Sequence, residues 1–244
     1  YSSVIMAIFS REMLEKLIAS RAMHFPTRLP GVDLRPAIWY NPELKSSIFL
    51  IPGLIGMILM SITVIRISIT IVKEKEMGTM EGLLVSPLKP IELMAGKIIP
   101  YIIIAFVSLI LILLLSRLIF AVPFRGSLLT FFLLSALFIA ASLGMGLYIS
   151  TVAQTAQTAW MMGFLSSMLP AIILSGFIFP IESMPRAIQL VTYLFPIRYY
   201  MVILRGIILK GAGMAILYPE AIILLLFALA LIAASALKFK KKVG

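Results

Sequence analysis

The sequence contains no cysteine and a single histidine, and only 13% of its 244 residues are charged. Without cysteine there is no disulfide framework and no thiolate chemistry, and the lone His24 gives no histidine pair for a metal site. Soluble domains carry about a quarter charged residues, whereas 61% of this chain is hydrophobic. A soluble core cannot hide that much apolar surface, so lipid is the solvent for much of the chain. These shortages exclude a soluble enzyme, a nucleic-acid-binding domain and a disordered chain.

Long apolar runs are present instead, and their lengths predict helices that span a membrane. About 20 apolar residues cross a bilayer as a helix, whereas the strands of membrane barrels are alternating segments of about ten. Residues 126–181 are uncharged over a length that suits two spans, with a break expected at the polar patch 150–158. We predict an all-α integral membrane protein with five transmembrane helices, at about residues 48–72, 97–119, 127–150, 157–180 and 216–237.

Small residues and proline in two of these spans predict close packing and bending. Gly144 and Gly146 allow a neighbouring helix to approach the third span closely. Pro170 and Gly176 permit a kink in the fourth.

Two further segments are not expected to span. Residues 1–46 contain several prolines, and they form either a membrane-surface helix with a linker or the C-terminal part of an extracytoplasmic domain. The second interpretation is favoured because residues 32–40 are typical of a strand that needs a partner. The chain opens on Tyr1 without a signal peptide, so we expect upstream residues to supply the rest of that domain. Residues 183–210 predict a pair of short re-entrant helices on the outer side.

The orientation of the spans is predicted from lysine and arginine, which favour the cytoplasmic side. The basic cluster at residues 238–242 places the C-terminus in the cytoplasm, and five spans then place residue 1 outside. Basic residues are otherwise nearly balanced between the two sides, so this assignment depends mainly on the tail. The lysines and arginines behind the net charge of +11 lie mostly on the flanks of the spans. We therefore expect a multi-pass protein of the cell membrane with no nucleic-acid partner.

The segment between the first two spans is unusually charged, with five charges between residues 72 and 81. Met77, Met80 and Leu84 recur at helical spacing, while Glu74 and Glu81 share another face. The pattern predicts a short amphipathic helix along the inner membrane surface, over about residues 74–87. It is either a solvated connector or, because a connector needs no apolar face, a segment that docks into a partner's groove.

This segment, EKEMGTMEGLLVSP at residues 74–87, resembles the signature of the type-2 ATP-binding-cassette permeases, and every fixed position of that signature is matched. Residues 39–46, the pattern of spans and the basic tail are also similar to that family, from about residue 32 to the end. The resemblance implies that residues 74–87 form a coupling helix resting on an ATP-binding subunit. It implies a contact through a set of signature residues: Glu74, Glu76, Met77, Gly78, Thr79, Met80, Glu81, Leu84, Ser86 and Pro87.

The same resemblance implies six spans in the whole subunit, of which residues 47–244 form the transmembrane domain present here. It also implies that two copies of the permease assemble as a homodimer. It favours ATP-driven export of drug-like compounds, lipids or glycans. No P-loop motif occurs, since Gly96-Lys97 is followed by Ile98. We therefore expect ATP and Mg to bind a partner ATPase, and no catalytic residue, metal or cofactor in this chain. A membrane-embedded scaffold and an ATPase-independent channel remain alternatives.

The first predicted span contains one charge, Arg66. Arg66 precedes Lys73 by seven residues, about 10 Å along a helix. It either extends to the inner interface or pairs with a carboxylate such as Glu74 or Glu92, and structural roles of this kind are favoured over a role in transport.

Overall fold

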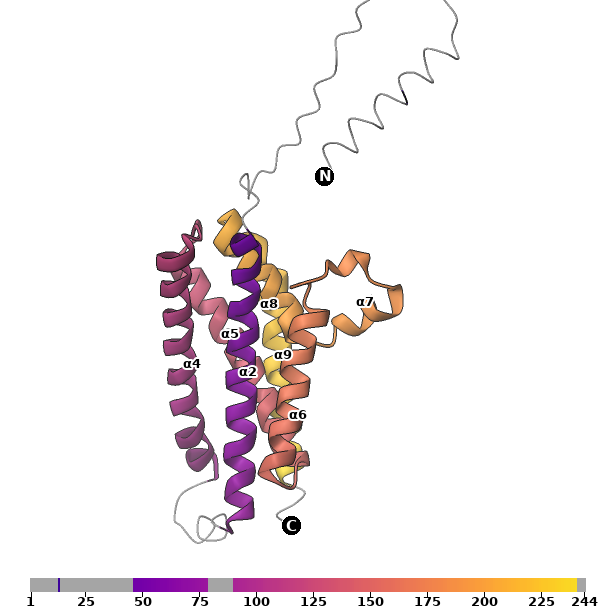
Figure 1. Cartoon of the computed structure of the whole chain (residues 1–244). Coiled ribbons are helices and arrows are strands. Elements are labelled where there is room, and N and C mark those ends of the chain that lie inside the picture. Colours follow the sequence, from indigo (N-terminus) through magenta and orange to yellow (C-terminus); the bar gives the residue numbers. More distant parts are fainter. Residues whose placement is uncertain (1–12, 14–45, 79–89, 241–244) are drawn as a thin grey trace, which may run out of the picture. The chain divides into compact units, whose positions relative to one another are not determined.

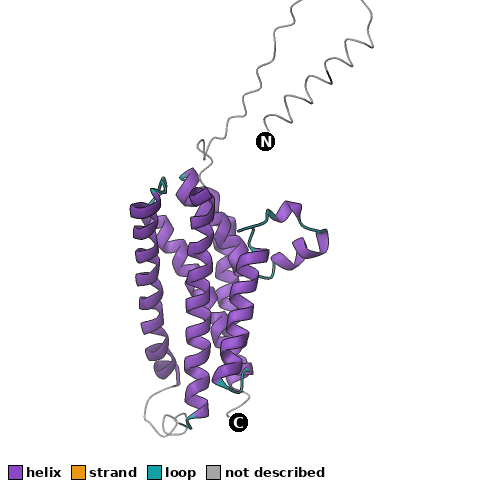
Figure 2. Ribbon diagram, viewed as in Figure 1, coloured by secondary structure: helices purple, strands orange, loops and turns teal. Residues whose placement is uncertain are grey.

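The computed structural model describes residues 13, 46–78 and 90–240, and the regular elements in these ranges are helices (Figure 2). The chain divides into two units, residues 1–37 and 38–244, and all helices named below belong to the second. The expected outer domain at residues 1–46, including its strand, lies outside the described residues apart from Met13 and Ser46.

Candidate membrane spans make up most of the described part of the second unit, which confirms the predicted all-α membrane fold. Within the described ranges, five helical segments are long and apolar enough to cross a membrane. They are α2 (Ser46–Glu76), α4 (Pro90–Phe120), α5 (Leu128–Val152), α6 (Ala156–Leu169) with its π-helical continuation η1 (Pro170–Leu174), and α9 (Met214–Lys240).

The turn between α5 and α6 lies within the predicted polar patch. Only residues 153–155 separate the two helices. Thr155 caps α6 by accepting the backbone N–H of Thr158 at 3.1 Å, and the Thr158 hydroxyl accepts the N–H of Thr155 at 3.1 Å. This reciprocal capping satisfies amides that would otherwise have no partner at the helix start.

The fourth span is shorter than predicted, because its helix ends at Leu174 and not near residue 180. Pro170 has no amide hydrogen, and the regular α-helix changes to a π-helix at that residue. Gly176 then has a φ of 78°, which suits glycine and takes the chain out of the helix. The Phe177 N–H donates to the Ser175 hydroxyl at 3.1 Å instead of to a helical carbonyl.

Helix α2 packs against α4, α5, α6 and α8, and α5 packs against α9. A Cβ added at Gly146 would overlap Ile67 and come within 2.8 Å of the Val64 carbonyl oxygen. At Gly144 it would lie 3.0 Å from Leu231 Cβ. Both glycines therefore permit the close helix contacts that the sequence predicted.

Between η1 and α9 the chain forms two short helices, α7 (Arg186–Thr192) and α8 (Pro196–Arg205), preceded by η2 (Ile181–Ser183). α8 continues as η3 (Gly206–Lys210), and α7 is bent by 85° relative to the α8–η3 helix. Figure 1 shows α7 projecting from the bundle, and it contacts η1, while α8 returns into the bundle and contacts α2, α5 and α9. Gly211, with a φ of 68°, ends the second piece.

The bundle has two ends that are named here by residues of α2. At the Glu76 end, α2 and α9 finish and α4 and α6 begin; the Ser46 end is opposite (Figure 1).

Near the Glu76 end, aromatic side chains of several helices lie at the same height along the bundle. The Tyr101 hydroxyl of α4 lies 2.6 Å from the Thr70 hydroxyl of α2. Ser68 donates to the carbonyl of Ala159 at 3.4 Å, which places the neighbouring Trp160 of α6 at the same level. Tyrosine and tryptophan concentrate at membrane–water interfaces, so this level indicates a membrane boundary.

Helices α5 and α9 agree with that boundary. Lys238 Nζ of α9 lies 3.4 Å from the Tyr148 hydroxyl of α5. The exposed Tyr218 lies twenty residues before Lys238 on α9, which is about 30 Å along a helix. The hydrocarbon core of a bilayer has about that thickness. We call Tyr101, Tyr148 and Trp160 the aromatic belt.

Candidate functional site

The first candidate site is the C-terminal end of α2, where the sequence signature starts. The structure differs from the sequence prediction here, because residues 74–76 form the last turn of the span and do not begin a separate surface helix. Lysine and glutamate are good helix formers, so the helix continues past the membrane boundary. It is ended by Gly78, whose φ is 66°, and the Met77 N–H donates to the Lys73 carbonyl at 3.0 Å.

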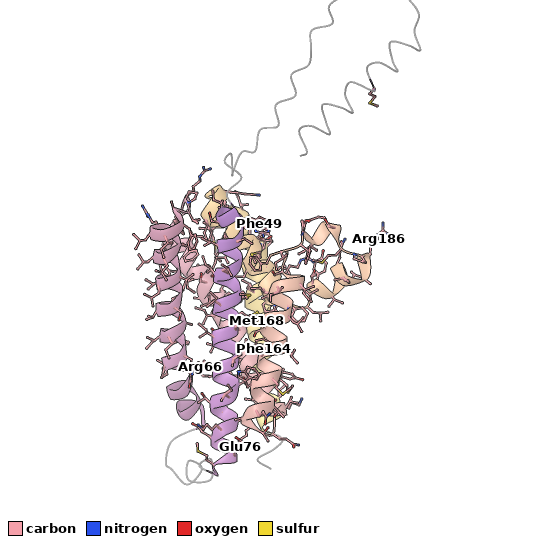
Figure 3. All side chains as sticks on the ribbon, in the orientation of Figure 1. Phe49, Arg66, Glu76, Phe164, Met168 and Arg186 are labelled. Atoms are coloured by element: carbon pink, nitrogen blue, oxygen red, sulfur yellow. The ribbon has the colours of Figure 1, made fainter. Side chains whose placement is uncertain are left out.

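The described signature residues are accessible at the tip of α2. Glu76 is exposed (Figure 3), Met77 is 59% exposed and Glu74 is half-buried. Gly78 is exposed, and apart from its chain neighbours no atom of the described residues lies within 4 Å of a Cβ added there. The remaining predicted coupling residues lie outside the described residues: Thr79, Met80, Glu81, Leu84, Ser86 and Pro87.

The tip of α2 is braced against α5 and α6. Lys75 Nζ donates to the Ser150 carbonyl of α5 at 2.6 Å. Val72, Ala153 and Ala159 form a small buried apolar cluster beside it. These contacts attach the C-terminal end of α2 to the end of α5 and the start of α6.

We expect Lys75→Met to weaken this brace and to lower the stability of the bundle by about 1.5–3 kcal/mol, since it removes a charge-assisted hydrogen bond. Thermal unfolding in detergent measures the change. Lys73→Met is the matched control, because Lys73 is exposed and surface substitutions usually change stability by less than about 0.5 kcal/mol. Equal losses in both variants would show that the brace contributes nothing.

A second candidate site is a junction at the Ser46 end, formed by Gly53, Phe177 and Arg205. The Phe177 ring is 5% exposed and fills the space beside Gly53, where an added Cβ would overlap it. Arg205 Nη2 donates to the carbonyls of Gly176 at 2.9 Å and Phe177 at 3.4 Å. The Arg205 guanidinium also lies 4.4 Å from the ring centroid of Phe49, at the start of α2.

The junction fixes the non-helical chain after η1 to both α2 and α8. Sequence reasoning predicted bending at Gly176 but missed the junction. The one feature of the local sequence that points to the junction is Arg205, at the C-terminal end of α8.

Arg66 is exposed on the side of α2 that faces α4 (Figure 3). Of its two predicted partners, Glu74 lies eight residues further along α2, about 12 Å along the helix axis, and that pairing stays a prediction. The other, Glu92, is treated below. In the part of the chain that the structure describes, no three carboxylate or imidazole groups gather as metal ligands.

Comparison with known proteins gives a family and several relatives. Residues 2–237 match the family described as "ABC-2 family transporter protein". "Probable multidrug ABC transporter permease YbhS" of Escherichia coli (strain K12) is 38% identical over 213 residues, covering 87% of this chain and 56% of the relative. "Probable multidrug ABC transporter permease YbhR" of the same organism is 35% identical over 205 residues, covering 84% and 55%. "Inner membrane transport permease YhhJ", also from that strain, is 31% identical over 219 residues, covering 88% and 58%. The chain thus spans a little more than half the length of the curated relatives it matches.

Proposed function

The chain belongs to the ABC-2 family of transporter proteins, and from this membership we propose that it forms the membrane permease of an ATP-driven exporter. ATP and Mg bind a separate ATPase subunit, and this chain contributes no catalytic residue. The observation that carries the proposal is the signature at residues 74–87, which follows directly from the end of α2.

The geometry of α2 supports a coupling role for the signature. α2 is one continuous helix of 31 residues from the Ser46 end to Glu76. A push on the exposed tip at Glu76 and Met77 therefore moves the whole span as a rigid element. The Lys75 brace carries the same motion into α5. Rigid-body shifts of this kind are a common means of switching between transport states.

The partners, orientation and cargo follow from the same proposal. A second copy of the permease completes a pathway across the cell membrane, and the two ATPase subunits dock at the two Glu76 ends. Lys73, Lys75 and Lys238 lie at or beyond the aromatic belt, which supports a cytoplasmic Glu76 end and C-terminus. Two of the relatives are named multidrug permeases, which supports export of drug-like apolar compounds ahead of lipids or glycans.

The test is Leu84→Asp in the intact permease. Burial of an apolar anchor in a partner groove is worth about 1.5–3 kcal/mol, and an aspartate adds the loss of its hydration. We expect normal membrane insertion, but at least about tenfold weaker association with the ATPase and loss of substrate-stimulated ATP hydrolysis. Co-purification and ATPase assays measure both.

Two further substitutions calibrate that test. Met80→Leu conserves the apolar face and is expected to behave as the wild type. Glu81→Lys alters a rim charge and is expected to weaken association more mildly. Wild-type association and hydrolysis in Leu84→Asp would reduce the segment to a connector. Flux without ATP would identify a channel, and absence of any flux would identify a scaffold.

A further inference from the structure

A groove between α2 and α4 contains the one arginine that lies within the apolar part of α2. Its volume is about 460 Å³, and it is lined by Ile62, Arg66, Tyr101, Ile104 and Ser108. Arg66 lies one turn before Thr70, so its Cα is about 6 Å inside the aromatic belt. A cationic group thus opens onto the membrane just within its boundary, between apolar walls.

The direction in which α2 runs places the Arg66 guanidinium on the membrane side of the aromatic belt. Side chains on a helix incline toward its N-terminus, which for α2 is the Ser46 end. Arg66 therefore leans toward Ile62 and the middle of the membrane, and away from the nearer water. An uncompensated charge in that position is costly, so the guanidinium needs an anion in the groove.

No carboxylate of α4 can supply that anion. The Thr70–Tyr101 contact fixes the level of two antiparallel helices, and the backbone of Glu92 lies nine residues before Tyr101. Glu92 is thus about 13 Å beyond the belt, on the opposite side of it from Arg66. Arg66 lies four residues from Thr70 in the opposite direction. The backbones of Arg66 and Glu92 are therefore about 20 Å apart along the helix axes, which is too far for an ion pair.

The surrounding groups shape the groove for an anionic head with an apolar tail. Thr70 donates to the Arg66 carbonyl at 2.9 Å, so its contact with Tyr101 uses the phenolic hydrogen and fixes the tyrosine beside the arginine. The fork of the Arg66 guanidinium suits phosphate oxygens. Exposed apolar residues of α4 continue from the groove toward the Ser46 end: Ile104, Val107, Leu111, Leu114, Leu115 and Leu118.

We propose that Arg66 binds the phosphate of a membrane phospholipid in the leaflet at the Glu76 end. Its acyl chain lies along the seam of α2 and α4, over Ile62 and Ile104. Basic pockets between transmembrane helices near the cytoplasmic side are known to take anionic lipid heads. The site is separate from the coupling segment, and its occupancy does not depend on the proposed function.

The experiment is a lipid titration of the intact permease in neutral detergent, followed by native mass spectrometry. Phosphatidylglycerol is the probe, and diacylglycerol with the same chains is the control that lacks phosphate. We expect wild type to retain phosphatidylglycerol and not diacylglycerol. Arg66→Gln is expected to weaken retention about tenfold or more, which corresponds to loss of a hydrogen bond to a charged group. Arg66→Lys is expected to retain part of it.

Lys73→Gln is the matched variant, because it removes an exposed cation on the far side of the belt and should leave retention unchanged. Equal retention of diacylglycerol, or equal losses in Arg66→Gln and Lys73→Gln, would overturn the phosphate site. Saturation by inorganic phosphate alone would do so too, since it would identify a soluble anion as the ligand. Unchanged lipid retention in Arg66→Gln, with lower thermal stability without lipid, would assign the arginine to a protein partner instead.

Discussion

Gly146→Leu is expected to force α2 and α5 apart and to destabilise the permease by about 3 kcal/mol or more. A leucine side chain at this position overlaps Ile67, and its Cβ lies 2.8 Å from the backbone oxygen of Val64. A flexible side chain can move aside, but a helix backbone cannot move without shifting the whole span. Overpacking in a core usually costs about 1–3 kcal/mol, and backbone contact places this variant at the upper limit.

Thermal unfolding of the detergent-solubilised permease measures the effect, and a fall in Tm on the order of 10 °C is expected for that loss. Gly96→Leu is the matched control, since no atom that the structure describes, its chain neighbours aside, lies within 4 Å of a Cβ added at Gly96 in α4. A leucine also favours helix over glycine, so the control is expected to be neutral or slightly stabilised. A Tm within 2 °C of wild type for Gly146→Leu would show that α2 and α5 are not in close contact.

Much of the architecture was predictable because membrane spans are specified by local composition. The five apolar runs appear as the five spanning helices, since their backbone hydrogen bonds must be satisfied internally in lipid. The break between α5 and α6 lies at Thr155, where polar side chains can cap a helix and apolar ones cannot. Gly144 and Gly146 were recognised as contact positions because only small residues allow helix backbones to approach closely.

The boundaries were less predictable, because apolarity and helicity end at different residues. Lys73 and Glu74 end the apolar run of the first span, but both residues favour helix, so α2 continues to Glu76. In the fourth span the reverse holds. The sequence remains apolar to residue 181, but Pro170 and Gly176 end the helix within that run.

The junction at the Ser46 end was not predictable, since its contacts join residues far apart in the chain. Nothing local to Gly53 indicates that an aromatic ring fills the space beside it. Nothing local to Arg205 indicates that its guanidinium binds the carbonyls of Gly176 and Phe177. The coupling segment is the opposite case: the motif predicts which residues contact a partner, but most of them lie outside the described residues, so that contact stays a prediction.

Gly53 and Phe177 are expected to be energetically coupled, which a double-mutant cycle measures. Gly53→Ala places a methyl group in the space of the Phe177 ring, whose Cγ atom is only 2.7 Å from the added Cβ. The ring must leave its buried position, and this overpacking costs about 1–3 kcal/mol. Phe177→Ala leaves a cavity beside Gly53 and costs about 3 kcal/mol or more.

In the double variant the new methyl group occupies part of the space that the ring has left. The combined loss is therefore expected to fall short of the sum of the single losses by at least about 1 kcal/mol, as is usual for residues in contact. Phe179→Ala provides the matched pair, because Phe179 is 58% exposed two residues further along the same linker. Its loss should simply add to that of Gly53→Ala. If the Phe177 cycle is additive as well, the Phe177 ring is not held against α2 at Gly53.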